Sequence, residues 1–198
     1  SSDTTQGRRI FWGRVAAGTV APGTPVQIFP SGQFAMVAQV LDHARQPTPV
    51  RADTSAGIIL DREVDVSRGD WILAAPGAAP EAVPGVSPDA SPAWPAPRAL
   101  RATVAWMDEE PLVAGRVYWA LHGHRWVKAK VLAVLHRLNV NTLAEEDATE
   151  LAPNAIGHVQ LLLQEPLPTA AFGRSRRLGA LILVDTASHK TAGTVLIH

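Results

Sequence analysis

The chain has 198 residues, which is enough for one large domain or for two small ones with cores of their own. Its 18 basic residues balance 18 acidic residues, so it exerts no general electrostatic pull on nucleic acid or anionic lipid, and no apolar run approaches the roughly 20 residues that cross a bilayer. The absence of cysteine excludes disulfides, thiolate metal sites and a cysteine nucleophile. Because the first residues lack the apolar core of a signal peptide, the expected location is cytoplasmic, away from membranes.

Short apolar segments separated by turns marked with glycine and proline fill residues 1–75. The polar residues 1–7 are expected to be disordered. Beyond them, segments with the length and composition of strands occur at 10–15, 26–29, 34–41, 56–60 and 71–75. No pattern of helix length lies between them. This spacing predicts a small antiparallel barrel or sandwich.

Residues 76–97 differ in kind from the segments on either side. They hold seven of the chain's sixteen prolines together with Ala, Gly and Ser and almost no charge. Such a composition cannot pack a core and predicts a stiff, extended linker between a domain at 1–75 and a second domain at 98–198. Trp94 within it either docks on a neighbouring surface or is exposed; the pattern does not separate these alternatives.

Apolar and polar residues alternate more clearly in the second half, which predicts a second all-β domain. The positions expected to face inward are Ala102, Val104, Trp106, Val127, Ala129, Val131, Ala133, Val159, Leu161 and Leu163. On the opposite face of the last of these strands, His158 and Gln160 are expected to be exposed. The continuous apolar run at 180–184 predicts a strand covered on both faces.

Two local patterns predict how strands of the second half are connected. His122, Gly123 and His124 read as a hairpin tip. Two histidines at this spacing can also be metal ligands on one side of a strand, but the glycine marks a turn and no third ligand is apparent, so we favour a plain turn. Thr142 and Glu145 have capping-box spacing, which predicts a single helical turn over 144–151.

Two clusters of charge are candidates for chemistry. Asp61, Glu63 and Asp65 could serve metal binding or acid–base catalysis, although alternating acids before a strand are more typical of a solvated loop. Arg68 is expected to pair with these acids or with an adjoining domain, and Gly69 permits the sharp turn into the strand that follows. The second cluster could grip phosphate, sulfate or RNA, but an exposed loop is favoured; it comprises Arg174, Arg176 and Arg177.

Several segments are similar, in order and spacing, to one known family. The glycine-marked residues 12–26, followed by Arg-Gly-Asp at 68–70, resemble the second domain of translation-factor GTPases. Val-Ala-Trp-Met at 104–107, Val-Asn-Thr-Leu at 140–143 and Asn-Ala-Ile-Gly at 154–157 are similar to the third domain of the GTP-binding large subunit of bacterial sulfate adenylyltransferase. The resemblance spans residues 11 to 198 apart from the linker.

This resemblance implies an all-β fold of two small antiparallel β-barrels of the translation-factor, or elongation-factor, type. In the family, a small catalytic subunit makes adenylyl sulfate and diphosphate from ATP and sulfate, and the large subunit couples GTP hydrolysis to that step. The chain would be a non-catalytic part with two partners, a GTPase domain in cis or in trans and the small subunit. The acidic loop at 61–70 would supply the candidate interface, which consists of Asp61, Glu63, Asp65, Arg68 and Asp70.

The sequence departs from the family pattern in three respects. It contains neither the phosphate-binding GxxxxGK[ST] loop nor an Asn-Lys-x-Asp motif, so we expect no cofactor in this chain, with GTP and Mg²⁺ belonging to the family's GTPase domain. The first strand of the first barrel is expected to be absent, and the glycine-rich turn at 188–194 is altered. The chain is therefore either part of a larger protein or a free-standing relative. The alternative function is a translation-factor-like module that contacts RNA or the ribosome, against which the neutral charge counts.

Overall fold

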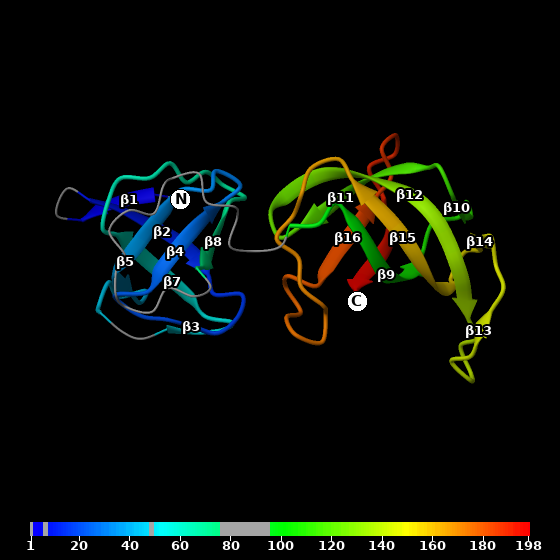
Figure 1. Cartoon of the computed structure of the whole chain (residues 1–198), viewed down its shortest axis with the longest axis horizontal. Helices are drawn as coiled ribbons and strands as arrows, with labels where there is room; N and C mark the ends of the chain where they lie inside the picture. The colour runs from blue at the N-terminus through cyan, green and yellow to red at the C-terminus, as the bar shows by residue number, and fades with distance from the viewer. Residues whose placement is uncertain (1, 6–7, 48–49, 76–95) are drawn as a thin grey trace. The chain divides into compact units, whose positions relative to one another are not determined.

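The protein folds into two compact units, Ser1–Pro95 and Ala96–His198, in a computed structural model that describes residues 2–5, 8–47, 50–75 and 96–198 (Figure 1). The described residues form strands and turns and contain no helix, which confirms the all-β class. None of them therefore forms a helix able to span a membrane. The predicted linker, including Trp94, lies outside the described residues except at 96–97.

The first unit is built around one antiparallel sheet of six strands. In chain order the strands of this unit are β1 (Ser2–Thr5), β2 (Arg8–Arg14), β3 (Thr19–Val20), β4 (Pro25–Phe29), β5 (Phe34–Leu41), β6 (Val50–Arg51), β7 (Ser55–Leu60) and β8 (Trp71–Ala74). The sheet has the order β1-β2-β7-β5-β4-β8, and β3 pairs with β6. All five predicted strands are present within two residues of their expected bounds.

Strand β1 corrects the expectation of disorder at the start of the chain. It pairs in antiparallel fashion with β2, so that Ser2 lies opposite Phe11. The hydrogen bonds of a sheet come from the backbone, and a polar segment can therefore extend a sheet at an edge that is open to pairing. Polar composition alone was a poor guide to this segment.

The second unit is a closed barrel of six antiparallel strands with two short pairs at its margin. Its strands are β9 (Ala99–Trp106), β10 (Leu112–Val113), β11 (Val117–His122), β12 (Arg125–Leu138), β13 (Glu145–Glu146), β14 (Glu150–Leu151), β15 (Ile156–Leu163), β16 (Ala180–Val184) and β17 (Thr191–Ile197). The order is β11-β16-β17-β9-β15-β12, and pairing of β12 with β11 closes the ring. Strand β13 extends the sheet beyond β12, and β10 pairs with β14. Closure leaves no free edge in the ring itself.

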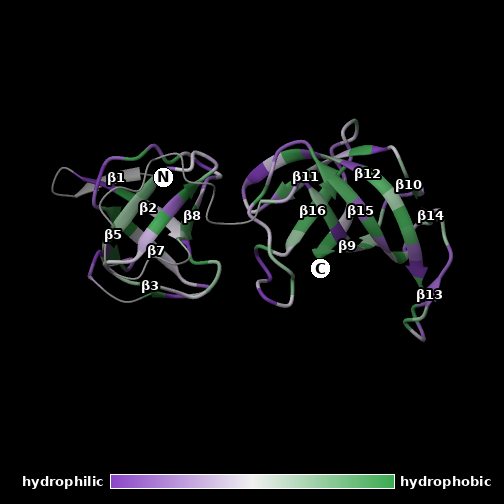
Figure 2. Ribbon diagram, viewed as in Figure 1, coloured by the Kyte–Doolittle hydropathy of each residue, from purple (hydrophilic) through white to green (hydrophobic). Residues whose placement is uncertain are grey.

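The apolar alternation of the second unit points into the barrel as predicted, with one exception. Nine of the ten positions expected to face inward are buried, and hydrophobic and hydrophilic stretches follow one another along β12 in Figure 2. Ala133 is only half-buried. A β-bulge between Val131 and Ala133 shifts the register, so that Ala133 lies opposite Gln160 and Val134 packs against the core instead.

Two expectations about outer faces of the barrel are wrong. His158 and Gln160 are half-buried and not exposed; the ring of His158 is covered in part by the rings of His136 and His198. Strand β16 is not covered on both faces, because the side chain of Ile182 is 38% exposed.

The two predicted connections have opposite outcomes. The hairpin is confirmed: β11 and β12 are joined at Gly123 and His124, and Gly123 has a φ of 60°. The helical turn is wrong, since residues 139–144 form a tight turn and strands β13 and β14 follow. The hydroxyl of Thr142 accepts from the backbone N–H of Ala144, two residues on, and Leu143 has a left-handed φ of 58°. Threonine thus stabilises a turn where the capping-box spacing predicted a helix.

Candidate functional site

The two hairpin histidines do not form a joint site. His122 is fully buried, with its Nε2 atom 3.0 Å from the carbonyl oxygen of Leu178, whereas His124 is exposed at the tip. Burial lowers the pKa of His122, and the hydrogen bond to Leu178 opposes this in part. The plain-turn interpretation therefore describes the tip, and His122 belongs to the interior of the barrel wall.

The acidic loop of the first unit is held by backbone contacts at its two ends. At the first end, Asp61 accepts from the backbone N–H of Met36 at 2.7 Å and from the guanidinium of Arg62 at 2.9 Å. The hydrogen bond from Arg62 is the main cause of the lowered pKa of Asp61. At the other end, Asp70 accepts from the backbone N–H of Ser67 at 2.8 Å.

The remaining charges of this loop point to solvent. Glu63, Asp65 and Arg68 are exposed, and Arg68 makes no ion pair or side-chain hydrogen bond within the described part of the chain. The arginine that pairs with Asp61 is Arg62, so Arg68 is not the partner of this acid, and its pairing with an adjoining domain stays a prediction. Within the described ranges the three carboxylates of the cluster do not converge on one point, as metal binding would require. The interface role of the loop stays a prediction.

A surface pocket lies beside the first end of the loop. Both signs of charge meet there: basic residues of β2 stand across from the acids that follow β7. Its lining consists of Arg8, Arg9, Phe11, Leu60, Asp61, Arg62, Glu63 and Val64. The three arginines of the other charged cluster are exposed in the connection between β15 and β16, as favoured from the sequence; they are Arg174, Arg176 and Arg177.

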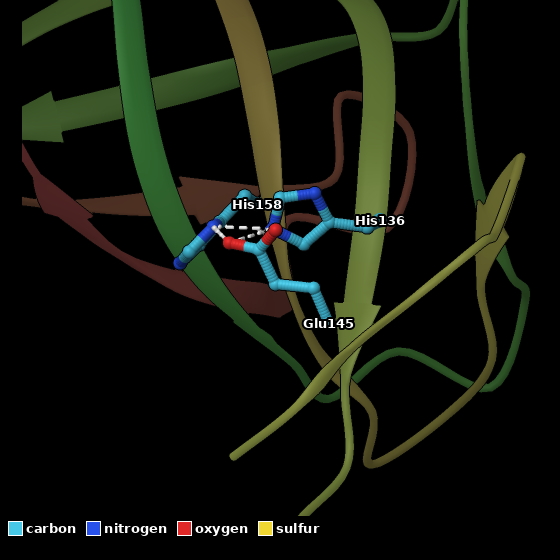
Figure 3. A group of neighbouring side chains, drawn as sticks. All are labelled: His136, Glu145 and His158. Atoms are coloured by element: carbon cyan, nitrogen blue, oxygen red, sulfur yellow. Dashed lines mark hydrogen bonds and ion pairs between the residues drawn. The ribbon is translucent and has the colours of Figure 1, made fainter.

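Sequence reasoning missed a group of three side chains on the outer face of the second barrel. His136 of β12, Glu145 of β13 and His158 of β15 point toward one another (Figure 3). His136 and His158 lie directly opposite each other on neighbouring strands. A second bulge, between Val134 and His136, turns the histidine outward although Val134 faces the core. The bulge thus brings the two rings onto one face.

The position of Glu145 beside the histidines is set by the contacts of the next residue, Glu146. Glu146 accepts hydrogen bonds from Arg137 at 2.7 Å and from the side-chain amide of Asn139 at 2.9 Å, and these bonds lower its pKa. Asn139 also accepts from two backbone N–H groups of the 139–144 turn. These contacts fix β13 against β12, and Glu145 extends toward the two rings.

Distances within the group are those of direct contact. The Nε2 atom of His136 lies 2.6 Å from Nδ1 of His158 and 3.1 Å from a carboxylate oxygen of Glu145, and that oxygen is 3.8 Å from Nδ1 of His158. The ring of His198 packs on the ring of His158 and is hydrogen-bonded to Thr103 at 2.7 Å. Desolvation lowers the pKa of His158, helped by the two neighbouring histidines and opposed by Glu145. Two imidazole nitrogens and a carboxylate oxygen are donors suited to a divalent metal.

Comparison with known proteins identifies relatives across both units. The chain is 34% identical over 190 residues to sulfate adenylyltransferase subunit 1 of Laribacter hongkongensis and 35% identical over 186 residues to the bifunctional enzyme NodQ of Azospirillum brasilense. These matches cover 96% and 94% of this chain but only 37% and 28% of the relatives. The resemblance to the sulfate adenylyltransferase large subunit is thereby confirmed.

The fold is also found among solved structures. A crystal structure of Sup35 complexed with GDP is similar with a TM-score of 0.78, covering 100% of this chain and 45% of that one at 16% identity. At this identity the likeness shows the fold alone, which is of the translation-factor type. The family model described as GTP-eEF1A C-terminal domain-like matches residues 99–198. The chain belongs to the GTP-eEF1A C-terminal domain-like family.

Proposed function

We propose that the chain is the non-catalytic, two-barrel part of the large subunit of a sulfate adenylyltransferase, the enzyme that makes adenylyl sulfate and diphosphate from ATP and sulfate. The observation that carries this proposal is the continuous similarity, over 96% of the chain, to a protein named subunit 1 of that enzyme. Its partners would be a GTPase domain, which would bind the GTP and Mg²⁺, and the small catalytic subunit. Its role would be to transmit the state of the GTPase domain.

The loop at 61–70 supports this role because its two ends are held by hydrogen bonds while Glu63, Asp65 and Arg68 are exposed to a partner. Asp61 and Asp70 are bonded to backbone N–H groups, and Arg68 projects between these anchored ends. An exposed guanidinium can form charge-assisted hydrogen bonds that exist in only one nucleotide state of a neighbouring domain. We therefore propose that Asp61, Glu63, Asp65, Arg68 and Asp70 face the GTPase domain.

The test is the substitution Arg68→Ala in a complete large subunit reconstituted with the small subunit. We expect GTP stimulation of adenylyl sulfate synthesis to fall while the basal rate stays intact. The fold should hardly change, since an exposed charge contributes at most about 1 kcal/mol. Arg51→Ala, in the same unit and also exposed, is the matched control and should behave as wild type. Both rates are measured in one preparation for each protein.

Two results would contradict the proposal at different levels. Unchanged GTP stimulation in Arg68→Ala would remove this arginine from the coupling route but leave the subunit assignment standing. Tight binding of structured RNA at physiological salt, with no binding of the small subunit, would favour the alternative of a translation-factor-like module that contacts RNA or the ribosome.

A further inference from the structure

We propose that His136, Glu145 and His158 form a binding site for a divalent transition-metal ion, with Zn²⁺ as its best fit. The three ligand atoms come from three strands, and all lie within 4.8 Å of one another. Nothing in the proposed coupling role calls for these residues to meet. The site lies wholly within the second barrel and is independent of the loop at 61–70.

The triangle formed by the ligand atoms has the size that a zinc ion requires. Its sides are 2.6, 3.1 and 3.8 Å. The centre of such a triangle lies about 1.9 Å from each corner, slightly less than the metal–ligand distance of about 2.0–2.1 Å. An ion bound to all three atoms would therefore sit just outside the plane of the triangle. That is the position of zinc above three ligands of a tetrahedron, with the fourth place open to water.

Without a metal, these three atoms cannot all form good hydrogen bonds with one another. The Nε2 atom of His136 faces both the lone pair or proton of His158 Nδ1 and the carboxylate oxygen of Glu145. A neutral imidazole has one N–H, so this atom can donate to one of the two or to neither. A metal ion accepts lone pairs from all three atoms at once. The convergence is thus better matched by a shared cation than by a shared proton.

The barrel holds these ligands in place before any ion binds. His136 and His158 are a cross-strand pair whose side chains are only 19% and 22% exposed, whereas the side chain of Glu145 is 64% exposed. The carboxylate therefore marks the side from which an ion enters. The ring of His198 packs edge to face with the ring of His158 and is itself hydrogen-bonded to Thr103. Ligand orientation by neighbouring hydrogen bonds is typical of metal sites.

The donor set selects among metals. Two imidazole nitrogens and one carboxylate suit zinc and its first-row neighbours, while Mg²⁺ and Ca²⁺ prefer sites built from oxygen alone. A bound ion would link β13 to the barrel strands β12 and β15. It would thereby fasten the 139–144 turn, whose Val140 and Leu143 are 66% and 72% exposed, to the barrel wall.

The experiment titrates the full chain, freed of metal with a chelator, with Zn²⁺ in a calorimeter. We expect one ion per chain, no binding of Mg²⁺ or Ca²⁺, and Co²⁺ absorption bands typical of nitrogen and oxygen ligands. Glu145→Gln keeps the size of an exposed side chain and should weaken Zn²⁺ binding at least about tenfold, since loss of even a residue that only orients a ligand costs about that much. His158→Leu should abolish it. Glu109→Gln and His189→Asn, both exposed and outside the group, are matched controls and should bind as wild type.

The proposal would be overturned by a wild-type chain that binds zinc no more tightly than the His136→Leu, His158→Leu double variant. It would also be overturned if Glu145→Gln bound zinc with wild-type affinity. Because Glu145 is exposed, its substitution should leave the fold intact, so a loss of binding in that variant cannot be ascribed to unfolding. A circular dichroism spectrum equal to that of the wild type documents this for each variant.

Discussion

The two units enclose their cores differently, although both are antiparallel β structures. In the second unit, 20 buried apolar residues form one cluster inside a closed ring of strands, and Trp106 and Tyr118 meet edge to face at 5.3 Å within it. In the described part of the first unit, buried apolar residues form two separate clusters, one of ten residues and one of three. A closed, continuous core makes a rigid frame, so a histidine pair can be placed on its outer wall. The first unit instead presents its charges on a loop.

The largest expected loss of stability should come from creating a cavity in the closed core of the second unit. Leu161 is fully buried, and Leu161→Ala should lower the free energy of unfolding by about 2–5 kcal/mol because the ring cannot collapse around the void. Leu162 is the matched control, since it is the same residue type on the other face and is 39% exposed. Leu162→Ala should cost less than about 1 kcal/mol. Equal losses in urea unfolding would show that the register of β15 is wrong.

A smaller effect should come from adding one methyl group to a glycine in each unit. A Cβ at Gly157 would lie 2.5 Å from the backbone oxygen of His136, which cannot move without breaking the β12–β15 ladder. The three atoms nearest to a Cβ at Gly57 belong to the side chains of Ile10 and Trp12, the closest at 2.9 Å. Gly157→Ala should therefore cost about 1–3 kcal/mol and Gly57→Ala distinctly less.

The measurement is again urea unfolding of the full chain. Gly173→Ala is the control, since a Cβ there meets nothing within 4 Å, and it should be neutral or slightly stabilising. A greater loss at Gly57 than at Gly157 would contradict the view that the closed barrel is the less adaptable of the two units.

The sequence predicted the strands and most of the core because alternation is a local property. Val159, Leu161 and Leu163 recur at every second position, with the polar residues His158, Gln160 and Gln164 on the alternate positions around them, so the pattern is visible within a few residues. Ala133 does not follow this alternation, because a bulge adds one residue to the strand and the sequence pattern does not show it. The capping-box spacing of Thr142 failed because a turn and a helix start use the same hydroxyl.

The histidine group could not be predicted from the sequence because it too depends on a bulge. His136 and His158 are 22 residues apart and become neighbours only through the register of β12 with β15, which the bulge after Val134 sets. The partner of Asp61 was similarly hidden, because both Arg62 and Arg68 are near enough in sequence to reach it. Motifs and charge can indicate that a loop is a candidate site, but which charged side chains contact each other is determined by the fold.

The smallest predicted effect is a loss of stability at acidic pH, which should begin at a higher pH in the second unit than in the first. His122 is buried at the end of β11, and burial lowers its pKa below the ordinary value of 6.5. The unfolded chain takes up a proton near that ordinary value, while the folded chain resists it. Stability from His122 is therefore intact above about pH 6.5 and is lost as the pH falls from there toward the folded pKa. In the first unit, Asp61 has a pKa lowered below 3.8, chiefly by Arg62, so its contribution is lost only at more acidic pH.

Replacing His122 with glutamine isolates this contribution, because the glutamine amide can still donate to the carbonyl of Leu178 but does not titrate. Between about pH 7.5 and pH 5, His122→Gln should lose less unfolding free energy than the wild type. His124→Gln, at the exposed tip of the same hairpin, should keep the wild-type loss. The measurement is urea unfolding of all three proteins at both pH values. If His122→Gln lost as much stability on acidification as the wild type, His122 would have to be protonated inside the folded barrel, and its burial would not control the acid response of the second unit.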